Sequence, residues 1–378
     1  MRRLTFVAAV AITVAGAASL AASPKRTSPL GLTLPPVCYA VVGVPMSIYY
    51  DNIVLTEKPE DYRFTIGCTI GMAEDRRWTV TPTAGDVGDH PLSVAIGHRN
   101  GKLIERGKMV VRVVPADAGA GRAIRLLIVG DSLTHATAYP NEIARLLSQP
   151  GNPEWTMLGT HRPSFAAKGV GHEGYGGWTW DLFANHYVAA PDPSRRTHSS
   201  PFVFAPEGRP SVQPAIDLPR YFQSCCGGRR PDFVTFLLGI NDCFGAKPDD
   251  PAAIDARVDA MFKHADKLIA AFRQSSPKAE LGICLTTPPN ARESGFEANY
   301  KGSYHRWGWK KIQHRLVERE LEHFGGRDRE RIFTVPTELN LDPVDGYPVD
   351  NGVHPNEGGY RQVGASIFAW IKSRLGRG

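Results

Sequence analysis

A short run of branched apolar residues, followed at once by a glycine and two polar residues, constrains the fold of this chain most. Residues 124–129 read Ile-Arg-Leu-Leu-Ile-Val, and Gly130, Asp131 and Ser132 follow. A mostly apolar run without regular alternation is typical of a strand in a parallel sheet that is covered on both faces. Ligands bind at the carboxyl ends of such strands. Ser132 is therefore a candidate nucleophile, although a serine after a strand also commonly caps a helix or forms a turn.

The chain beyond this strand alternates between strand-like and helix-like patterns. Further strands are expected at 155–158, 233–238, 281–286 and 332–335. Helices are expected between them, at 141–147, 253–273, 307–324 and 358–375. This alternation predicts an α/β domain with a parallel sheet and right-handed crossovers over residues 123–378.

Residues 35–115 have the pattern of a separate all-β domain. Leu92, Val94 and Ile96 alternate with other residues, and Asn100-Gly101 then forms a typical hairpin turn. Further strands are expected at 47–55, 63–69 and 78–81. Short strands separated by regular turns predict a small sandwich of the immunoglobulin-like type. We interpret it as a spacer or packing partner in preference to a carbohydrate-binding module.

Two segments of small or polar residues flank this all-β domain. Residues 116–122 are Ala-Asp-Ala-Gly-Ala-Gly-Arg, which predicts a linker between the two domains. Residues 23–34 contain serine, proline and lysine and are expected to form a flexible lead-in.

The N-terminus has the features of an export signal. Arg2 and Arg3 precede an apolar segment at 4–20, and Ser19-Leu20-Ala21 fits a small-residue cleavage site. We therefore expect a signal peptide at 1–22 and a secreted or periplasmic protein. A membrane anchor is the alternative, and the arginine pair leaves twin-arginine export open. No other stretch is long enough to span a bilayer, so no stable membrane insertion is expected after signal removal.

Composition argues against several other classes of protein. Hydrophobic residues make up 42% and charged residues 22% of the 378, which allows a sizeable core. The net charge of +6 comes from scattered basic residues without a nucleic-acid-binding motif, so no nucleic-acid partner is expected. The six cysteines fit an oxidising compartment, and their pairing stays open. The chain has neither a CxxC nor an HExxH motif, so no metal site is expected.

Three further segments could complete a serine hydrolase site. Gly177 lies in a glycine turn before an expected helix, and Asn241 follows the end of an expected strand. His354 precedes the last expected helix, where its imidazole could reach Ser132. Each has a simpler interpretation as a turn glycine, a cap or a helix-entry residue. Their occurrence together, each at the end of an element, favours one shared site.

The four segments also resemble, in the same order, the motif blocks of the SGNH/GDSL hydrolase family: Gly130-Asp131-Ser132-Leu133, Gly177, Gly239-x-Asn241-Asp242 and Val353-His354-Pro355-Asn356. The resemblance covers residues 123–378. It implies a flavodoxin-like three-layer α/β/α domain and ester hydrolysis without a cofactor. It further implies that Ser132 is the nucleophile and His354 the general base. The oxyanion hole would consist of the Ser132 and Gly177 N–H groups and the Asn241 amide.

One position departs from the pattern of that family, which usually places an aspartate three residues before the histidine. Here Asn351 occupies that position, and Asp350 lies four residues before His354. An asparagine carries no charge with which to stabilise an imidazolium. Asp350 could reach the histidine through a local shift, or Asp342 or Asp345 could approach it. We favour a Ser–His dyad oriented by Asn351 or by a backbone carbonyl.

Three aromatic or imidazole side chains are candidates for substrate contacts. His172 lies in a G-x-G-x-x-G segment, which we do not interpret as a dinucleotide site because no convincing strand leads into it. We expect His172 and Glu173, which precede Gly177, to shape the floor of the cleft. Trp178 follows Gly177, and Tyr304 lies in an expected long insertion at 288–304.

Together these patterns predict an exported serine esterase acting on a small-molecule or polysaccharide ester. A carbohydrate O-acetylesterase fits an exported hydrolase with an added β domain. The alternatives are a lipase or thioesterase for longer acyl chains, and a non-catalytic glycan-binding envelope protein on a hydrolase scaffold. The pattern of residues does not indicate an oligomeric state.

Overall fold

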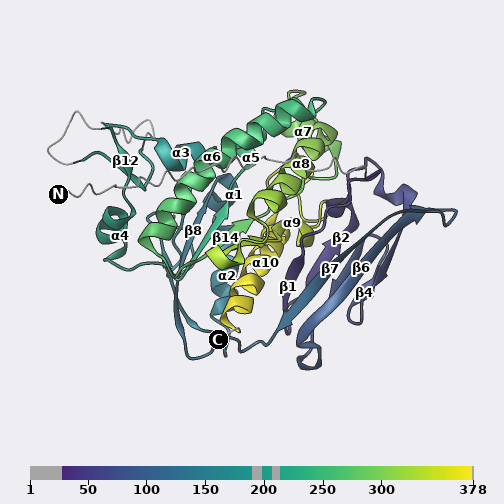
Figure 1. Cartoon of the computed structure of the whole chain (residues 1–378), viewed down its shortest axis with the longest axis horizontal. Helices are drawn as coiled ribbons and strands as arrows, with labels where there is room; N and C mark the ends of the chain where they lie inside the picture. The colour runs from purple at the N-terminus through teal and green to yellow at the C-terminus, as the bar shows by residue number, and fades with distance from the viewer. Residues whose placement is uncertain (1–27, 190–197, 207–212, 377–378) are drawn as a thin grey trace, which may run out of the picture.

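The α/β part of the chain is built on one parallel sheet. The computed structural model describes residues 28–189, 198–206 and 213–376, so the expected signal peptide at 1–22 lies outside the described residues. The sheet has the order β10-β8-β13-β14-β15, and β9 also pairs with β8 (Figure 1). Its strands are β8 (Ala123–Gly130), β9 (Glu154–Leu158), β10 (Glu173–Gly174), β13 (Phe233–Leu237), β14 (Glu280–Cys284) and β15 (Ile332–Val335).

This strand order is that of a flavodoxin-like sheet, in which the second strand lies outside the first. All pairings within it are parallel. Every residue of β13 and β15 is buried, because helices cover both faces of the sheet. The predicted α/β/α architecture is therefore confirmed, and the expected strands of the sheet are present with ends shifted by at most a few residues.

The helices form the two outer layers. Helix α2 packs against α10, while α6 packs against α3, α4, α5 and α8 (Figure 1). The helices are α1 (Ser132–His135), α2 (Ala138–Leu147), α3 (Trp180–Asn185), α4 (Leu218–Cys226), α5 (Ile240–Cys243), α6 (Pro251–Ser275), α7 (Glu293–Tyr300), α8 (Arg306–Phe324), α9 (Thr337–Asn340) and α10 (Glu357–Leu375). Helix α7 lies inside the segment 288–304, which was expected to be an insertion without regular structure.

The N-terminal domain consists of two small sheets that face each other. Their strand orders are β1-β7-β6-β3 and β2-β5-β4. The strands are β1 (Val37–Val41), β2 (Met46–Tyr49), β3 (Tyr62–Gly67), β4 (Met72–Ala73), β5 (Arg77–Val80), β6 (Gly88–His98) and β7 (Leu103–Val114). The predicted hairpin at Asn100-Gly101 joins β6 and β7, and Gly101 adopts the positive φ of 89° that this turn needs.

One strand of this domain is shorter than expected. The pattern at 47–55 predicted a continuous strand, but β2 ends at Tyr49 and a 3₁₀ helix, η1 (Tyr50–Ile53), follows. The side chain of Asn52 in η1 is buried and bonds to backbone carbonyls of the α/β domain. The chain therefore leaves the sheet to make a contact between domains.

The described part of the lead-in, which was expected to be flexible, and the linker are both packed against the protein. In the described part of the lead-in, Leu30 and Leu32 are buried in the core of the β domain. In the linker, Ala118 is buried and Gly119 lies so close to Leu375 that an added Cβ would be 2.7 Å from its side chain. Composition alone suggested mobility because it does not show which small or apolar residues find a partner.

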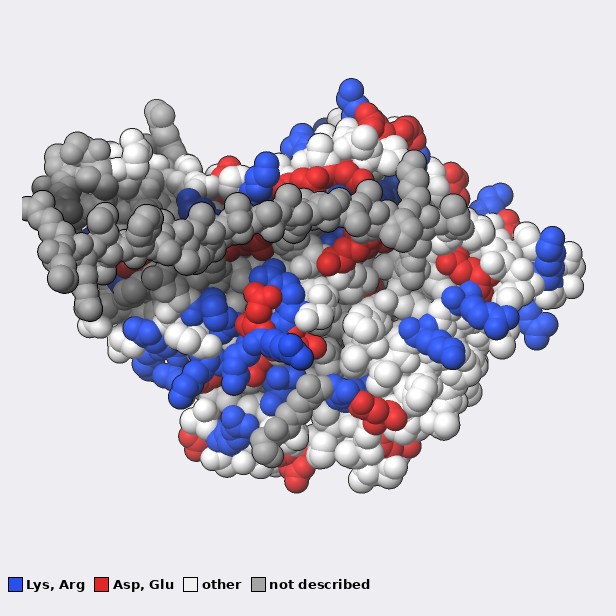
Figure 2. Space-filling model, viewed as in Figure 1, with Lys and Arg blue, Asp and Glu red and all other residues white. Residues whose placement is uncertain are grey.

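The charged side chains on the surface are of both signs, in agreement with the modest net charge of +6. Figure 2 shows basic and acidic side chains side by side over much of the face in view. In the part of the chain that the structure describes, no helix combines the length and apolar character needed to cross a bilayer.

Candidate active site

Ser132 lies at the carboxyl end of β8, as the first residue of α1. Its predecessor Asp131 is buried and caps the helix by accepting a hydrogen bond from Leu133 N at 2.9 Å. Gly130 permits the close turn into the helix, since a Cβ there would come within 2.8 Å of the carbonyl oxygen of Leu237. These contacts fix the backbone that carries the Ser132 hydroxyl.

The structure brings His354 to this serine across 222 residues of sequence, with Nε2 at 2.9 Å from Ser132 Oγ. His354 is held in the turn that enters α10, where Asn356 caps the helix by accepting from Gly359 N at 3.0 Å. Burial lowers the pKa of His354 below its ordinary value, so the neutral imidazole is favoured. A neutral imidazole with its proton on Nδ1 has Nε2 free to accept the serine proton.

The other ring nitrogen of His354 faces Asn351. The distance from His354 Nδ1 to Asn351 Oδ1 is 3.2 Å. The same oxygen accepts the backbone N–H groups of Val353 at 3.1 Å and His354 at 2.9 Å. Two backbone donors pointing at one atom identify it as the amide oxygen. Asn351 therefore holds the tautomer in which Nδ1 carries the proton.

The three aspartates that the sequence offered as partners of His354 do not orient its ring. Asp350 is exposed, and among the described residues no hydrogen bond joins it to His354. Asp342 and Asp345 instead form ion pairs with Arg76 of the β domain. Of the arrangements that the sequence left open, the geometry is that of a Ser–His pair oriented by a carboxamide.

Three N–H donors lie in the segments expected to form the oxyanion hole. Gly177 has a positive φ of 79° and faces open space, because an added Cβ would meet no atom within 4 Å. Asn241 Nδ2 donates one hydrogen to Trp178 O at 3.0 Å, and the second amide hydrogen remains for a ligand. Within the described parts of the chain, the N–H groups of Ser132 and Gly177 have no hydrogen-bond partner.

Asp242 and Glu173 support the loop that carries Gly177; Glu173 was expected to shape the cleft floor, and no such role was predicted for Asp242. Asp242 accepts from Trp180 N at 3.2 Å, and burial raises its pKa to about 7. Glu173 is fully buried and accepts from the Thr160 N–H and hydroxyl and from the hydroxyls of Tyr175 and Tyr221, at 2.5–2.9 Å. These four donor groups belong to three residues, and two of these residues, Thr160 and Tyr221, are 13 and 48 residues away in sequence, so only the tertiary structure reveals the cluster.

Asn290 is a further missed residue, and it supports the loop before His354. Its side-chain amide donates to Pro348 O and Asn351 O, both at 2.9 Å, and its own N–H donates to Gly352 O at 2.9 Å. A polar residue shortly after the end of β14 was a signal available in the sequence, because this edge of the sheet carries the site.

The three residues expected to contact the substrate are more buried than predicted. His172 is fully buried, with Nε2 at 3.0 Å from Thr137 Oγ1, and burial lowers its pKa to about 3. Its side chain is enclosed by protein and does not face solvent. Trp178 is only 8% exposed and stacks on His198. Tyr304 is half-buried against Phe244, whose ring centroid is 4.1 Å away.

A large groove lies between the β domain and the loops that follow β14 and β15. Its volume is about 880 Å³. Its walls are polar, charged and aromatic, and they include Tyr50, Tyr62, Arg63, Arg76, Ala291 and Val344. Ser132, Gly177, Asn241 and His354 are not among the residues that line this groove.

The described residues contain no group of three or more His, Cys, Asp or Glu side chains arranged to hold a metal ion. All six cysteines are free thiols in the structure.

No family model matches the chain, and neither does any curated protein. Solved structures similar to it include a carbohydrate esterase family 3 protein from Talaromyces cellulolyticus, with 15% identity, coverage of 68% of this chain and 99% of the other, and a TM-score of 0.39. A family two carbohydrate esterase from Clostridium thermocellum, solved with cellohexaose, covers 89% of this chain and 94% of its own at 14% identity and a TM-score of 0.37. An aryl esterase from M. smegmatis has 14% identity, coverage of 66% and 99%, and a TM-score of 0.37. Likeness at this level does not establish a shared activity. What this chain itself presents is a serine hydroxyl in contact with an imidazole that Asn351 orients. In the described ranges, the N–H groups of Ser132 and Gly177 are left without a hydrogen-bond partner.

Proposed function

We propose that this protein is a serine esterase of the SGNH/GDSL type that hydrolyses carboxylic esters through an acyl-enzyme. The observation that carries the proposal is the 2.9 Å contact between His354 Nε2 and Ser132 Oγ. A base within hydrogen-bond reach of a hydroxyl, itself oriented by a third group, is the arrangement that activates a serine nucleophile.

In the proposed reaction His354 removes the proton of Ser132 as the oxygen attacks the ester carbonyl. The negative charge that develops on the carbonyl oxygen is stabilised by the Asn241 amide and the Ser132 and Gly177 N–H groups. The protonated His354 then donates its proton to the departing alcohol. Water, deprotonated by His354, attacks the acyl group, and the proton returns to Ser132 as the acid leaves.

We further propose that the ester is an O-acyl group, with acetyl favoured, on a polysaccharide outside the cytoplasm. The β domain added to an exported hydrolase supports this proposal by analogy of architecture. The signal-like residues 1–22 support export of the protein. A glycan-binding protein without activity is the second candidate, and the uncharged Asn351 behind His354 is the observation that favours it.

Ester hydrolysis by the wild type and by Ser132→Ala tests the first proposal. We expect the wild type to hydrolyse p-nitrophenyl acetate and Ser132→Ala to lose at least about 10⁴-fold in kcat at an unchanged melting temperature. A series of p-nitrophenyl esters of rising acyl length, together with acetate release from acetylated polysaccharides, tests the substrate class. Wild-type rates in Ser132→Ala would contradict the mechanism. A preference for long acyl chains would favour a lipase or thioesterase, and glycan binding without hydrolysis would favour the non-catalytic protein.

A further inference from the structure

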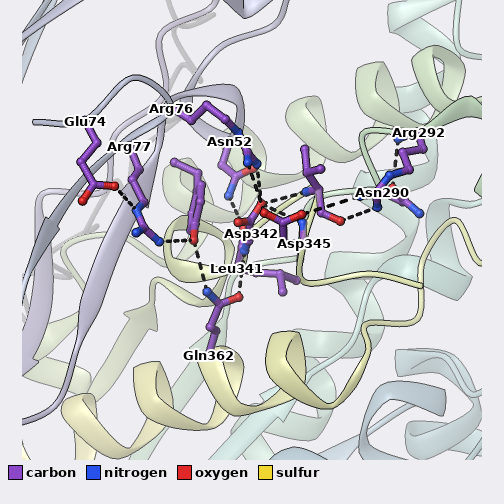
Figure 3. A network of polar contacts seen from close by, with 12 residues as sticks. Asn52, Glu74, Arg76, Arg77, Asn290, Arg292, Leu341, Asp342, Asp345 and Gln362 are labelled. Atoms are coloured by element: carbon purple, nitrogen blue, oxygen red, sulfur yellow. Dashed lines mark hydrogen bonds and ion pairs between the residues drawn. The ribbon is translucent and has the colours of Figure 1, made fainter. Parts of the chain in front are cut away.

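One part of the contact between the two domains consists of directed polar bonds from the β domain onto a short segment of the α/β domain. Asn52 of η1 donates through Nδ2 to the carbonyl of Leu341 at 2.8 Å (Figure 3). The same nitrogen donates to the carbonyl of Glu338, also at 2.8 Å. Asn52 is 5% exposed, so these bonds are shielded from water. In the same interface Ser47 N donates to Asn340 Oδ1 at 2.8 Å. The β domain thus fixes the end of α9 and the residue that follows it.

A charged bond from the β domain reaches the next turn. Arg76 donates to Asp342 Oδ1 at 2.6 Å, and it approaches Asp345 at 3.4 Å (Figure 3). The same Asp342 oxygen accepts the N–H groups of Val344 at 2.9 Å and Asp345 at 3.1 Å. One carboxylate oxygen therefore both organises the turn at 342–345 and ties it to Arg76.

This turn is connected to the catalytic loop on both sides of His354. On the N-terminal side the connection runs through residues 290 and 291: Ala291 N donates to Pro343 O at 2.6 Å, and the adjoining Asn290 donates to the carbonyls of Asn351 and Gly352.

On the C-terminal side of His354 the contact is direct: Asn356 Nδ2 donates to Asp345 O at 2.8 Å, and Asn356 N donates to Gly346 O at 2.9 Å. Asn356 is also the cap of α10. The loop from Asn351 to Asn356, with His354 inside it, is therefore anchored at both ends by segments that the turn at 342–346 supports.

We propose that the β domain is part of the catalytic apparatus, with Asn52 and Arg76 as positioning residues for His354. The proposal rests on the esterase function proposed above. Its physical reason is the neutral Asn351, because an uncharged partner orients the imidazole through hydrogen-bond geometry without the help of a full charge. A displacement of about 1 Å in a reacting group can lower a rate by about 10², so the anchoring of this loop affects turnover.

Kinetics with a small ester test this proposal. Asn52→Ala and Arg76→Gln are compared with Arg112→Gln, a matched control whose ion pair with Asp89 lies within the β domain. We expect kcat on p-nitrophenyl acetate to fall roughly 10-fold or more in the first two variants, with KM within about twofold. The control is expected to keep the wild-type kcat. Arg76→Lys, which retains the charge, is expected to recover part of the loss.

The small ester also separates positioning from substrate binding, because Arg76 lines the groove. Lost contacts with a polysaccharide would raise KM for that substrate and leave turnover of p-nitrophenyl acetate unchanged. Lower melting temperatures with a wild-type kcat in both Asn52→Ala and Arg76→Gln would overturn the proposal and make the interface purely structural.

Hydrogen exchange measured by mass spectrometry tests the same coupling without relying on activity. We expect faster exchange of the amides at 351–356 in Asn52→Ala and Arg76→Gln than in the wild type and Arg112→Gln, at a pH where all four proteins are folded. Unchanged exchange in this loop would overturn the proposal even if the protein is an esterase. A wild type without hydrolytic activity would contradict the proposed function, and the exchange result would still decide the coupling.

Discussion

At the scale of single residues, the unusual feature of the site is the carboxamide behind His354. Asn351 Oδ1 faces Nδ1 of the ring and is fixed by two backbone N–H groups, so the tautomer is set. It supplies no negative charge to the imidazolium that forms during the reaction. The site therefore has the orienting part of a triad and lacks its electrostatic part.

A substitution at this position separates the two parts. Activity requires neutral His354, so it falls as the pH drops through the pKa of this residue, which burial lowers below about 6.5. In Asn351→Asp the new carboxylate should raise that pKa, because it stabilises the charged ring. The acid limb of kcat/KM against pH is then expected to move to higher pH, while kcat on the plateau rises.

Asp350→Ala is the control for this pH profile, since Asp350 is exposed and lies beside Asn351 in the chain. It is expected to leave the profile of the wild type unchanged. A shift of the acid limb in Asp350→Ala, with none in Asn351→Asp, would mean that the other side chain orients His354 in solution.

At the scale of elements, the loop from β10 to α3 presents the backbone donor of Gly177. The loop is tied to the sheet by β10, to buried hydroxyls by Glu173 and to α5 by Asp242. Gly177 itself has φ 79°, a conformation that costs other residues about 1–2 kcal/mol. The loop thus holds a conformation that favours glycine at the place where the proposed mechanism uses an N–H.

Gly177→Ala should therefore change the loop conformation and lower kcat, although the added methyl group has room. Gly176→Ala is the matched control, because its Cβ also meets no atom within 4 Å and its φ is ordinary. We expect at least a 10-fold loss of kcat on p-nitrophenyl acetate for Gly177→Ala, and a rate near that of the wild type for Gly176→Ala. Equal effects of the two substitutions would argue against a specific role of the Gly177 N–H.

At the scale of the whole molecule, the two domains share buried surface and buried titratable groups. Leu339 of α9 belongs to the apolar core of the β domain. His314 of α8 is 3% exposed, and its Nε2 lies 2.6 Å from Gly31 O and 3.1 Å from Thr33 Oγ1 in the lead-in. Burial, together with the nearby Lys310, lowers the pKa of His314 to about 3.

This histidine should make the stability of the protein sensitive to acid. Its pKa is lower in the folded chain than in the unfolded chain, where it is about 6.5. The unfolded chain therefore binds the proton first, and the free energy of unfolding falls as the pH drops from about 6.5 toward about 3. His314→Gln is expected to weaken this dependence in denaturant titrations across that range.

His98→Gln, at an exposed histidine of β6, is the control and should keep the pH dependence of the wild type. An unchanged slope in His314→Gln would show that other groups, such as the buried His172, dominate the acid response.

The sequence predicted the sheet well, because runs such as 124–129 are buried on both faces and carry a plain apolar signal. The Ser132–His354 contact was predicted from the resemblance of its motifs, since no local pattern relates residues 222 positions apart. The hydrogen-bond partners of Glu173 and the role of Asn290 were missed, because the fold brings these partners together. Residues 23–34 were predicted to be flexible; for the described residues 28–34 this was wrong, because Leu30 and Leu32 pack into a core in another part of the chain.

Labelling with a fluorophosphonate probe tests the central claim most directly, because the reagent reacts with a serine only when a base activates it. We expect mass spectrometry of the labelled wild type to place the adduct on Ser132, and His354→Ala to label far more slowly at the same pH. An unlabelled Ser132 in the folded wild type, or equal labelling of His354→Ala, would contradict the account.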